Sequence, residues 1–134
     1  AENPSKKPTI KKFNNIQEKK TGLLIAFCCY AGGFIGNATK KELEVLYEFG
    51  LMLGRIFQIT DDILDKEGNQ KLLGKKVNKD DEQNKATLIK IKGLDFAKNE
   101  LSKFSQQAKN KLLLLNKDTE ILSYVIDYLC SRTS

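Results

Sequence analysis

The segment GRIFQITDDILD at residues 54–65 indicates a helical fold, because its apolar residues recur at helical spacing. Three carboxylates follow directly after these apolar residues. Upstream of it, Thr39 is followed three positions later by Glu42, the pattern of a capping box at the start of a helix. No proline interrupts the sequence between them. We therefore predict one long helix over residues 40–66 that carries the acidic motif near its end.

Two stripes of this helix are expected to pack. At 100° per residue, one stripe holds Leu43, Tyr47, Gly50, Gly54, Phe57, Asp61 and Asp65. The opposite stripe holds Met52, Ile56, Ile59 and Ile63. A helix that packs on both sides is central in a bundle, and Gly50 with Gly54 would let a neighbouring helix approach closely. The carboxylates thus share a packing stripe instead of a solvated face.

The remaining pattern is also helical, so the fold class is all-α. A short helix over residues 9–19, an apolar one over 20–35, and helices over 85–92, 94–115 and 119–131 are predicted, with a lysine-rich loop at 66–84. With 134 residues and two prolines, residues 1–134 form part of one helical domain. The apolar run at residues 22–36 is shorter than the roughly 20 residues of a bilayer span, so no membrane span is expected.

Composition excludes several classes of function. The chain has no histidine, and Cys28, Cys29 and Cys130 lack CxxC spacing, which argues against a zinc site or a Cys/His nucleophile. The vicinal cysteines are interpreted as core residues, and the unpaired set favours a reducing, cytoplasmic compartment. The net charge of +6 suits acidic partners, but no nucleic-acid motif accompanies it, so nucleic acid is not expected as a partner.

The acidic motif has the donor set of a magnesium site. Asp61 and Asp65, at i and i+4, share one face, while Asp62 lies one turn from Asp65 and Gln58 one turn earlier. Neighbouring carboxylates repel each other, and a divalent cation removes that cost. Oxygen ligands without histidine or cysteine favour Mg²⁺, which completes its shell with water and phosphate oxygens.

Basic residues near the motif predict a ligand with an anionic head. Lys75 and Lys85 lie in and beside the loop that follows it, and Lys20 with Thr21 opens the apolar helix. Mg²⁺ and ammonium groups beside an apolar helix pair would suit a diphosphate with an apolar tail. A solvated acidic helix end is the alternative reading of the aspartates, and plain surface position is the alternative for each lysine.

Three stretches together resemble the trans-isoprenyl diphosphate synthases, the family of farnesyl and geranylgeranyl diphosphate synthases. FQITDDILD at residues 57–65 resembles the family's second aspartate-rich motif, and KKTGLLIAF at 19–27 resembles its Lys-Thr helix start. LGKKVNKDDEQNKAT at 73–87 resembles the loop that follows. The short loops are most similar to bacterial-type farnesyl diphosphate synthases.

This resemblance implies the C-terminal portion of an all-α isoprenoid synthase fold, in an enzyme that is dimeric, cytoplasmic and dependent on Mg²⁺. Such prenyltransferases ionise an allylic diphosphate, and the double bond of isopentenyl diphosphate attacks the carbocation before a proton is lost. The resemblance assigns the metal to Asp61, supported by Asp62 and Asp65. It assigns the diphosphate to Lys20, Lys75 and Lys85, and it implies that Thr21 and Gln58 line the site and stabilise the cation.

Two departures limit what the resemblance implies. Asn78 and Asn84 stand where the family has glycines, which affects the expected loop shape but removes no ligand. The family's first aspartate-rich motif is missing, because the other Asp-Asp pair, Asp80-Asp81, belongs to the loop. The chain alone is therefore expected to be inactive in condensation. A non-catalytic helical module that binds diphosphate or serves as a partner subunit is the alternative, and product length is not encoded here.

Overall fold

The computed structural model describes residues 10–71 and 92–133, and all of its regular structure in these ranges is helical. The helices are α1 (Ile10–Ile35), α2 (Lys40–Lys71), α5 (Leu94–Leu113) and α6 (Glu120–Ser131). The expected all-α class is confirmed. Within the described ranges, no helix combines the length and hydropathy that crossing a bilayer would require.

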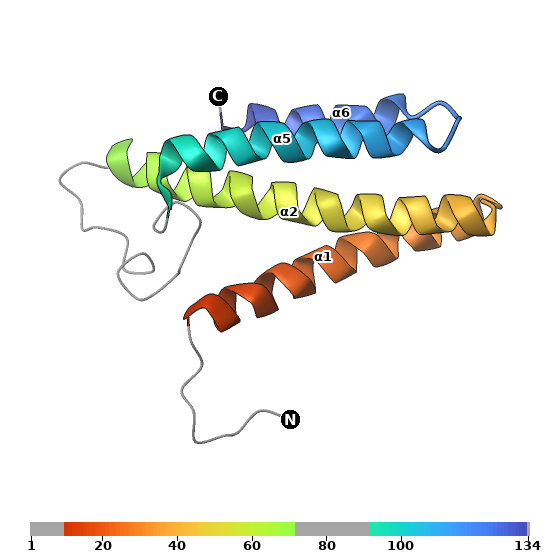
Figure 1. Ribbon diagram of the computed structural model, residues 1–134, viewed down its shortest axis with the longest axis horizontal. Helices are drawn as coiled ribbons and strands as arrows, with labels where there is room; N and C mark the ends of the chain where they lie inside the picture. The colour runs from red at the N-terminus through yellow and green to blue at the C-terminus, as the bar shows by residue number, and fades with distance from the viewer. Residues whose placement is uncertain (1–9, 72–91, 134) are drawn as a thin grey trace, which may run out of the picture.

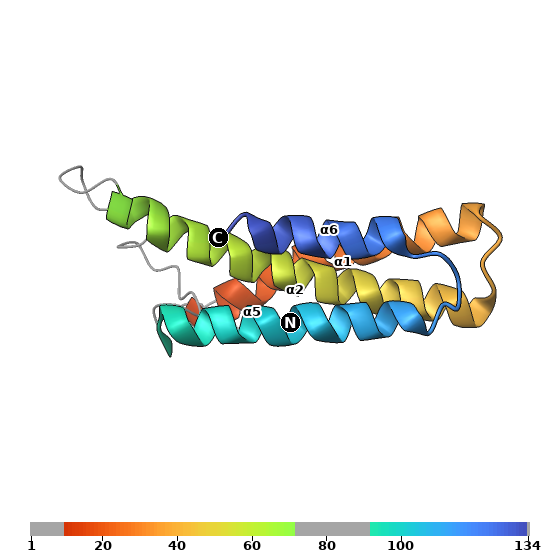
Figure 2. The same cartoon turned by 90° about the horizontal axis from the view of Figure 1, so that it is seen from above.

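Helix α2 is the centre of the bundle, as its two packing stripes predicted. It contacts α1 on one side and both α5 and α6 on the other (Figures 1 and 2). The main core lies on the second side, where Phe49, Ile56 and Ile63 are fully buried. Partners from the C-terminal helices close this core, namely Ala97, Leu101, Ala108, Leu112, Leu115 and Ile126. Ion pairs add to the packing, with Lys98 Nζ 3.1 Å from Glu67 Oε1 near the end of α2.

Glycines set the approach of α1 to α2. A methyl group built on Gly50 would lie 2.5 Å from the Ala26 Cα atom, and one built on Gly54 would lie 2.7 Å from the Gly22 Cα atom. Both distances are too short for any side chain, so backbone packs directly on backbone here. The expected close approach at Gly50 and Gly54 is confirmed, and it holds the start of the apolar run against the stripe that carries the aspartates.

The turn between α1 and α2 is fixed by local hydrogen bonds. Asn37 adopts a φ of 62°, and the Ala38 N–H donates to the Gly33 carbonyl over 2.9 Å, as in a Schellman motif. The predicted capping box is present at the start of α2. The Thr39 N–H donates to Glu42 Oε1 over 2.8 Å, and the Glu42 N–H donates to Thr39 Oγ1 over 3.1 Å.

Two helix boundaries differ from the sequence-based predictions. Residues 10–35 form one continuous helix, because the polar residues around position 19 contain no glycine or proline to end it. Helix α2 continues past Gly68 to Lys71, so Asp61 lies ten residues before its end. The predicted loop at 66–84 is thus wrong for residues 66–71, and its remainder lies outside the described residues, as does nearly all of the predicted helix at 85–92.

The cysteines are only partly core residues. Cys28 is exposed, which contradicts its interpretation as core filling, whereas Cys29 and Cys130 are half-buried against the core. Burial raises the pKa of the Cys29 thiol, with the neighbouring Cys28 adding to the effect. Burial likewise raises the pKa of Cys130. Both thiols therefore stay protonated at neutral pH.

Candidate diphosphate and metal site

The acidic motif lies on the flank of α2, between its buried faces. Thr60 and Ile63 are fully buried, whereas the Asp61 side chain is 41% exposed and Asp65 is exposed. Asp62 is partly buried. Since Asp61 lies well before the C-terminal end of α2, the helix dipole has little influence on it. The prediction that the carboxylates avoid a solvated face is therefore wrong for Asp65 and only partly right for Asp61, whose carboxylate is accessible from solvent.

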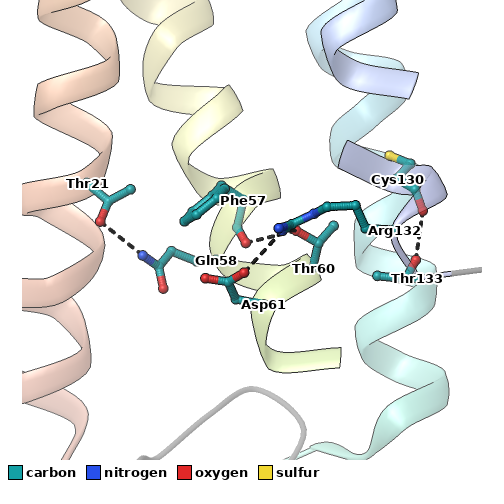
Figure 3. Close-up of polar contacts among 8 residues, drawn as sticks. All are labelled: Thr21, Phe57, Gln58, Thr60, Asp61, Cys130, Arg132 and Thr133. Carbon is teal, nitrogen blue, oxygen red and sulfur yellow. Dashed lines mark hydrogen bonds and ion pairs between the residues drawn. The ribbon is translucent and has the colours of Figure 1, made fainter. Parts of the chain in front are cut away.

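Two of the predicted site residues meet across the α1–α2 interface. The Gln58 Nε2 atom donates to Thr21 Oγ1 over 3.1 Å (Figure 3). These residues are 37 positions apart in the chain, and the close glycine contacts nearby bring their helices together. Gln58 lies one turn before Asp61 on α2. Thr21, which lies inside α1 and not at a helix start as predicted, therefore contacts α2 one turn before the acidic motif.

Arg132 completes the described part of the site from the end of α6. Its Nη2 atom donates to Thr60 Oγ1 over 2.7 Å and lies 3.1 Å from Asp61 Oδ1 (Figure 3). The guanidinium carbon lies 5.2 Å from the centre of the Phe57 ring, within the range of a cation–π contact. Three residues of one face of α2 thus hold the same guanidinium group.

Sequence reasoning missed Arg132, although it recognised the acidic stripe that Arg132 contacts. The ion pair joins residues 71 positions apart, and nothing in the local sequence relates the two. The sequence signal for Arg132 was its position, a basic residue directly after the helix predicted over residues 119–131. That signal gives a position near a helix end but does not identify its partner.

The other predicted ligands divide into two groups. Lys20 is exposed on α1, one position before Thr21. Lys75 and Lys85, predicted to hold the diphosphate, lie outside the described residues. The described part of the site therefore joins Thr21, Gln58 and Asp61, with Arg132 added.

The donor chemistry fits a magnesium site completed by water and substrate phosphates better than a site closed by protein ligands alone. Within residues 19–67 and 92–133, no three acidic or thiol side chains converge on a common point. Structural zinc requires such a closed set, whereas Mg²⁺ is commonly held by one or two carboxylates together with water and substrate phosphates. Asp61, whose side chain is 41% exposed, would be the carboxylate of such a site.

Comparison with known proteins gives the same family as the motifs. The sequence profile named polyprenyl synthetase matches residues 1–128. The farnesyl diphosphate synthase of Bacillus subtilis is 33% identical over 92% of this chain, and that of Geobacillus stearothermophilus is 34% identical over 98%. A short chain isoprenyl diphosphate synthase of Methanocaldococcus jannaschii is 38% identical over 65% of the chain.

The matched regions are only part of those relatives. The chain covers 42% of the Bacillus protein, 44% of the Geobacillus protein and 27% of the Methanocaldococcus protein. The family profile nevertheless extends over nearly the whole chain, including both helices that form the Thr21–Gln58 contact. The chain therefore belongs to the polyprenyl synthetase family.

Proposed function

We propose that this chain supplies the second half of the active site of an isoprenyl diphosphate synthase. The reaction would condense isopentenyl diphosphate with an allylic diphosphate such as dimethylallyl or geranyl diphosphate, giving a farnesyl- or geranylgeranyl-type product. The observation that carries the proposal is the hydrogen bond from Gln58 to Thr21, which joins two family motifs beside Asp61. Membership of the polyprenyl synthetase family gives the reaction class.

The residues of this chain would act mainly by binding Mg²⁺ and the negatively charged diphosphate. Asp61 would ligate Mg²⁺, with Asp62 and Asp65 supporting the ion directly or through water. Bound there, Mg²⁺ would neutralise the diphosphate and stabilise its departure as pyrophosphate. Lys20, Lys75 and Lys85 would hold the departing group, because ammonium charges that face a developing anion lower the barrier to ionisation.

Thr21 and Gln58 would act on the carbocation side of the site. The hydrogen bond from Gln58 to Thr21 fixes the amide and the hydroxyl groups, so their oxygen atoms can face a developing positive charge without reorganising. The same bond holds α1 beside the motif, which would orient the allylic chain along the two helices. An apolar wall next to these dipoles would keep water away from the cation.

The surface of α1 supports the view that the site has a second part. Large apolar side chains are exposed on this helix, namely Leu23, Leu24, Phe27, Phe34 and Ile35. The relatives are more than twice as long as the region matched here. We propose that the first aspartate-rich motif belongs to the remainder of such a fold, in a cytoplasmic homodimer, and that this chain alone does not condense its substrates.

Binding of inorganic pyrophosphate by this chain tests the proposed site directly. We expect calorimetric titration to show binding that requires Mg²⁺ and that is lost in Asp61→Asn. Asp127→Asn is the matched control, because Asp127 lies on α6 and pairs with Lys109 on α5. Magnesium-independent binding, or equal binding by Asp61→Asn, would contradict the site.

A non-catalytic helical module that binds diphosphate or serves as a partner subunit is the second candidate function. The 134 residues hold one DDxxD motif, whereas the proposed chemistry needs two. Such a module would bind pyrophosphate with Mg²⁺ in the same titration. It would differ in giving no prenyl transfer in the longest protein encoded by the reading frame that contains this chain.

A further inference from the structure

Arg132 contacts one oxygen of the Asp61 carboxylate, the group that the proposed function assigns to the metal. Its Nη2 atom lies 3.1 Å from Asp61 Oδ1, in an ion pair whose Arg132 and Asp61 side chains are 26% and 41% exposed. The same nitrogen donates to the buried Thr60 hydroxyl over 2.7 Å. The Asp61 charge is therefore already partly neutralised by a residue of the chain itself.

The guanidinium group of Arg132 makes hydrogen bonds to α2 at Nη2 but none at Nε. Both hydrogen bonds to α2 leave from Nη2, and the Phe57 ring supports the guanidinium face. The buried Nε–H has no acceptor among the described residues. Arg132 directly follows the last residue of α6. Withdrawal of the guanidinium would therefore break its hydrogen bonds to Asp61 and to the buried Thr60 hydroxyl, but none at Nε.

A magnesium ion and the Arg132 guanidinium would compete for Asp61, because both are positively charged. A magnesium ion about 2.1 Å from Asp61 Oδ1 would lie within about 5 Å of the guanidinium nitrogen. Charges of +2 and +1 at that separation repel enough, even with the dielectric constant of water, to weaken metal binding roughly tenfold. The repulsion disappears if the guanidinium moves away when the metal binds.

We propose that Arg132 is an internal counter-ion of Asp61 that a divalent cation must displace. The proposal rests on the assignment of Asp61 as a metal ligand. Arg132 is then a positioning residue, because it acts through Asp61 and its charge sets the magnesium concentration at which the site fills. The end of α6 would be released from α2 in the same step.

Magnesium titrated into this chain by calorimetry, at fixed ionic strength, tests the proposal. Arg132→Gln should bind Mg²⁺ roughly tenfold more tightly than the wild type, because the competing charge is gone. Arg132→Lys keeps the charge and should stay near the wild-type affinity. Lys109→Gln, which removes one positive charge from α5 where it pairs with Asp127, should change nothing. Circular dichroism checks that each variant is folded.

Three results would overturn the proposal in distinguishable ways. Equal or weaker binding by Arg132→Gln would remove the counter-ion role and leave Asp61 as a ligand. Tighter binding by both Arg132→Gln and Arg132→Lys would show that shape, and not charge, controls the site. Absence of binding by every variant would overturn the metal assignment of Asp61 together with the proposal.

A second measurement needs no variant. Side-chain nitrogen NMR of Arg132 in the wild-type chain should show its resonances shifting with Mg²⁺, with the same midpoint as the calorimetric titration. Resonances that stay unchanged while Mg²⁺ binds would mean that the guanidinium keeps its place, which contradicts displacement.

Discussion

Two carboxylates of α2 are stabilised in different ways, and the difference explains which one is available for chemistry. The Glu42 carboxylate accepts a hydrogen bond from the Thr39 N–H at the start of α2. Its Oε2 atom also lies 3.4 Å from Lys117 Nζ. Asp61 is engaged from the far end of the chain by a single guanidinium nitrogen. Glu42 is therefore committed to structure, whereas Asp61 has a partner that can leave.

The capping role of Glu42 predicts a pH dependence of stability. Its pKa lies below its ordinary value, chiefly because the Thr39 backbone N–H donates to the carboxylate. A carboxyl group with a lowered native pKa stabilises the fold above its unfolded pKa of about 4.3, and the benefit is lost as pH falls through the native pKa. Urea unfolding should show Glu42→Gln less stable than wild type at pH 6, with the gap narrowing toward pH 3. Parallel stability curves would contradict this role.

At the scale of the helices, the α1–α2 contact depends on two glycines. Gly50→Ala and Gly54→Ala would force methyl groups against the backbone of α1 at 2.5 and 2.7 Å. Overpacking of this kind costs about 1–3 kcal/mol, partly offset by the better helix propensity of alanine. We expect both variants to have lower urea midpoints than the wild type.

Gly32→Ala is the matched control for these glycines. A methyl group on Gly32 meets no atom within 4 Å, and Gly32 is likewise inside a helix. It should raise stability by about 0.5–1 kcal/mol through propensity alone. If all three variants shifted the urea midpoint by the same amount, the close backbone contact would be disproved.

The helices show what could be predicted from sequence and what could not. The start of α2 was predictable because the Thr39 and Glu42 signal is local, and its two stripes followed from helical periodicity. The end of α2 was predicted too early, because Gly68 is a weak helix former that packing can override. The boundary inside α1 was wrong for a related reason, since a polar stretch without a helix breaker does not end a helix.

At the scale of the whole molecule, the site depends on contacts between distant parts of the sequence. The family resemblance implied that Thr21, Gln58 and Asp61 line one site, and α1 and α2 do bring Thr21 to Gln58. Arg132 could not be predicted, because its contact with Asp61 depends on how α6 packs on α2. The roles of Lys75 and Lys85 stay predictions, since both residues lie outside the described ranges.

Asp61 is proposed to serve prenyl transfer, and measurement of turnover tests this role. Condensation of labelled isopentenyl diphosphate with geranyl diphosphate would be measured in the full-length protein that contains this chain, comparing wild type, Asp61→Ala and the α6 control Asp127→Ala. Asp61→Ala should lose activity by a factor on the order of a hundred or more while staying folded, because an organised electrostatic group is removed. Asp127→Ala should match the wild type. Near-normal turnover by Asp61→Ala would contradict the account.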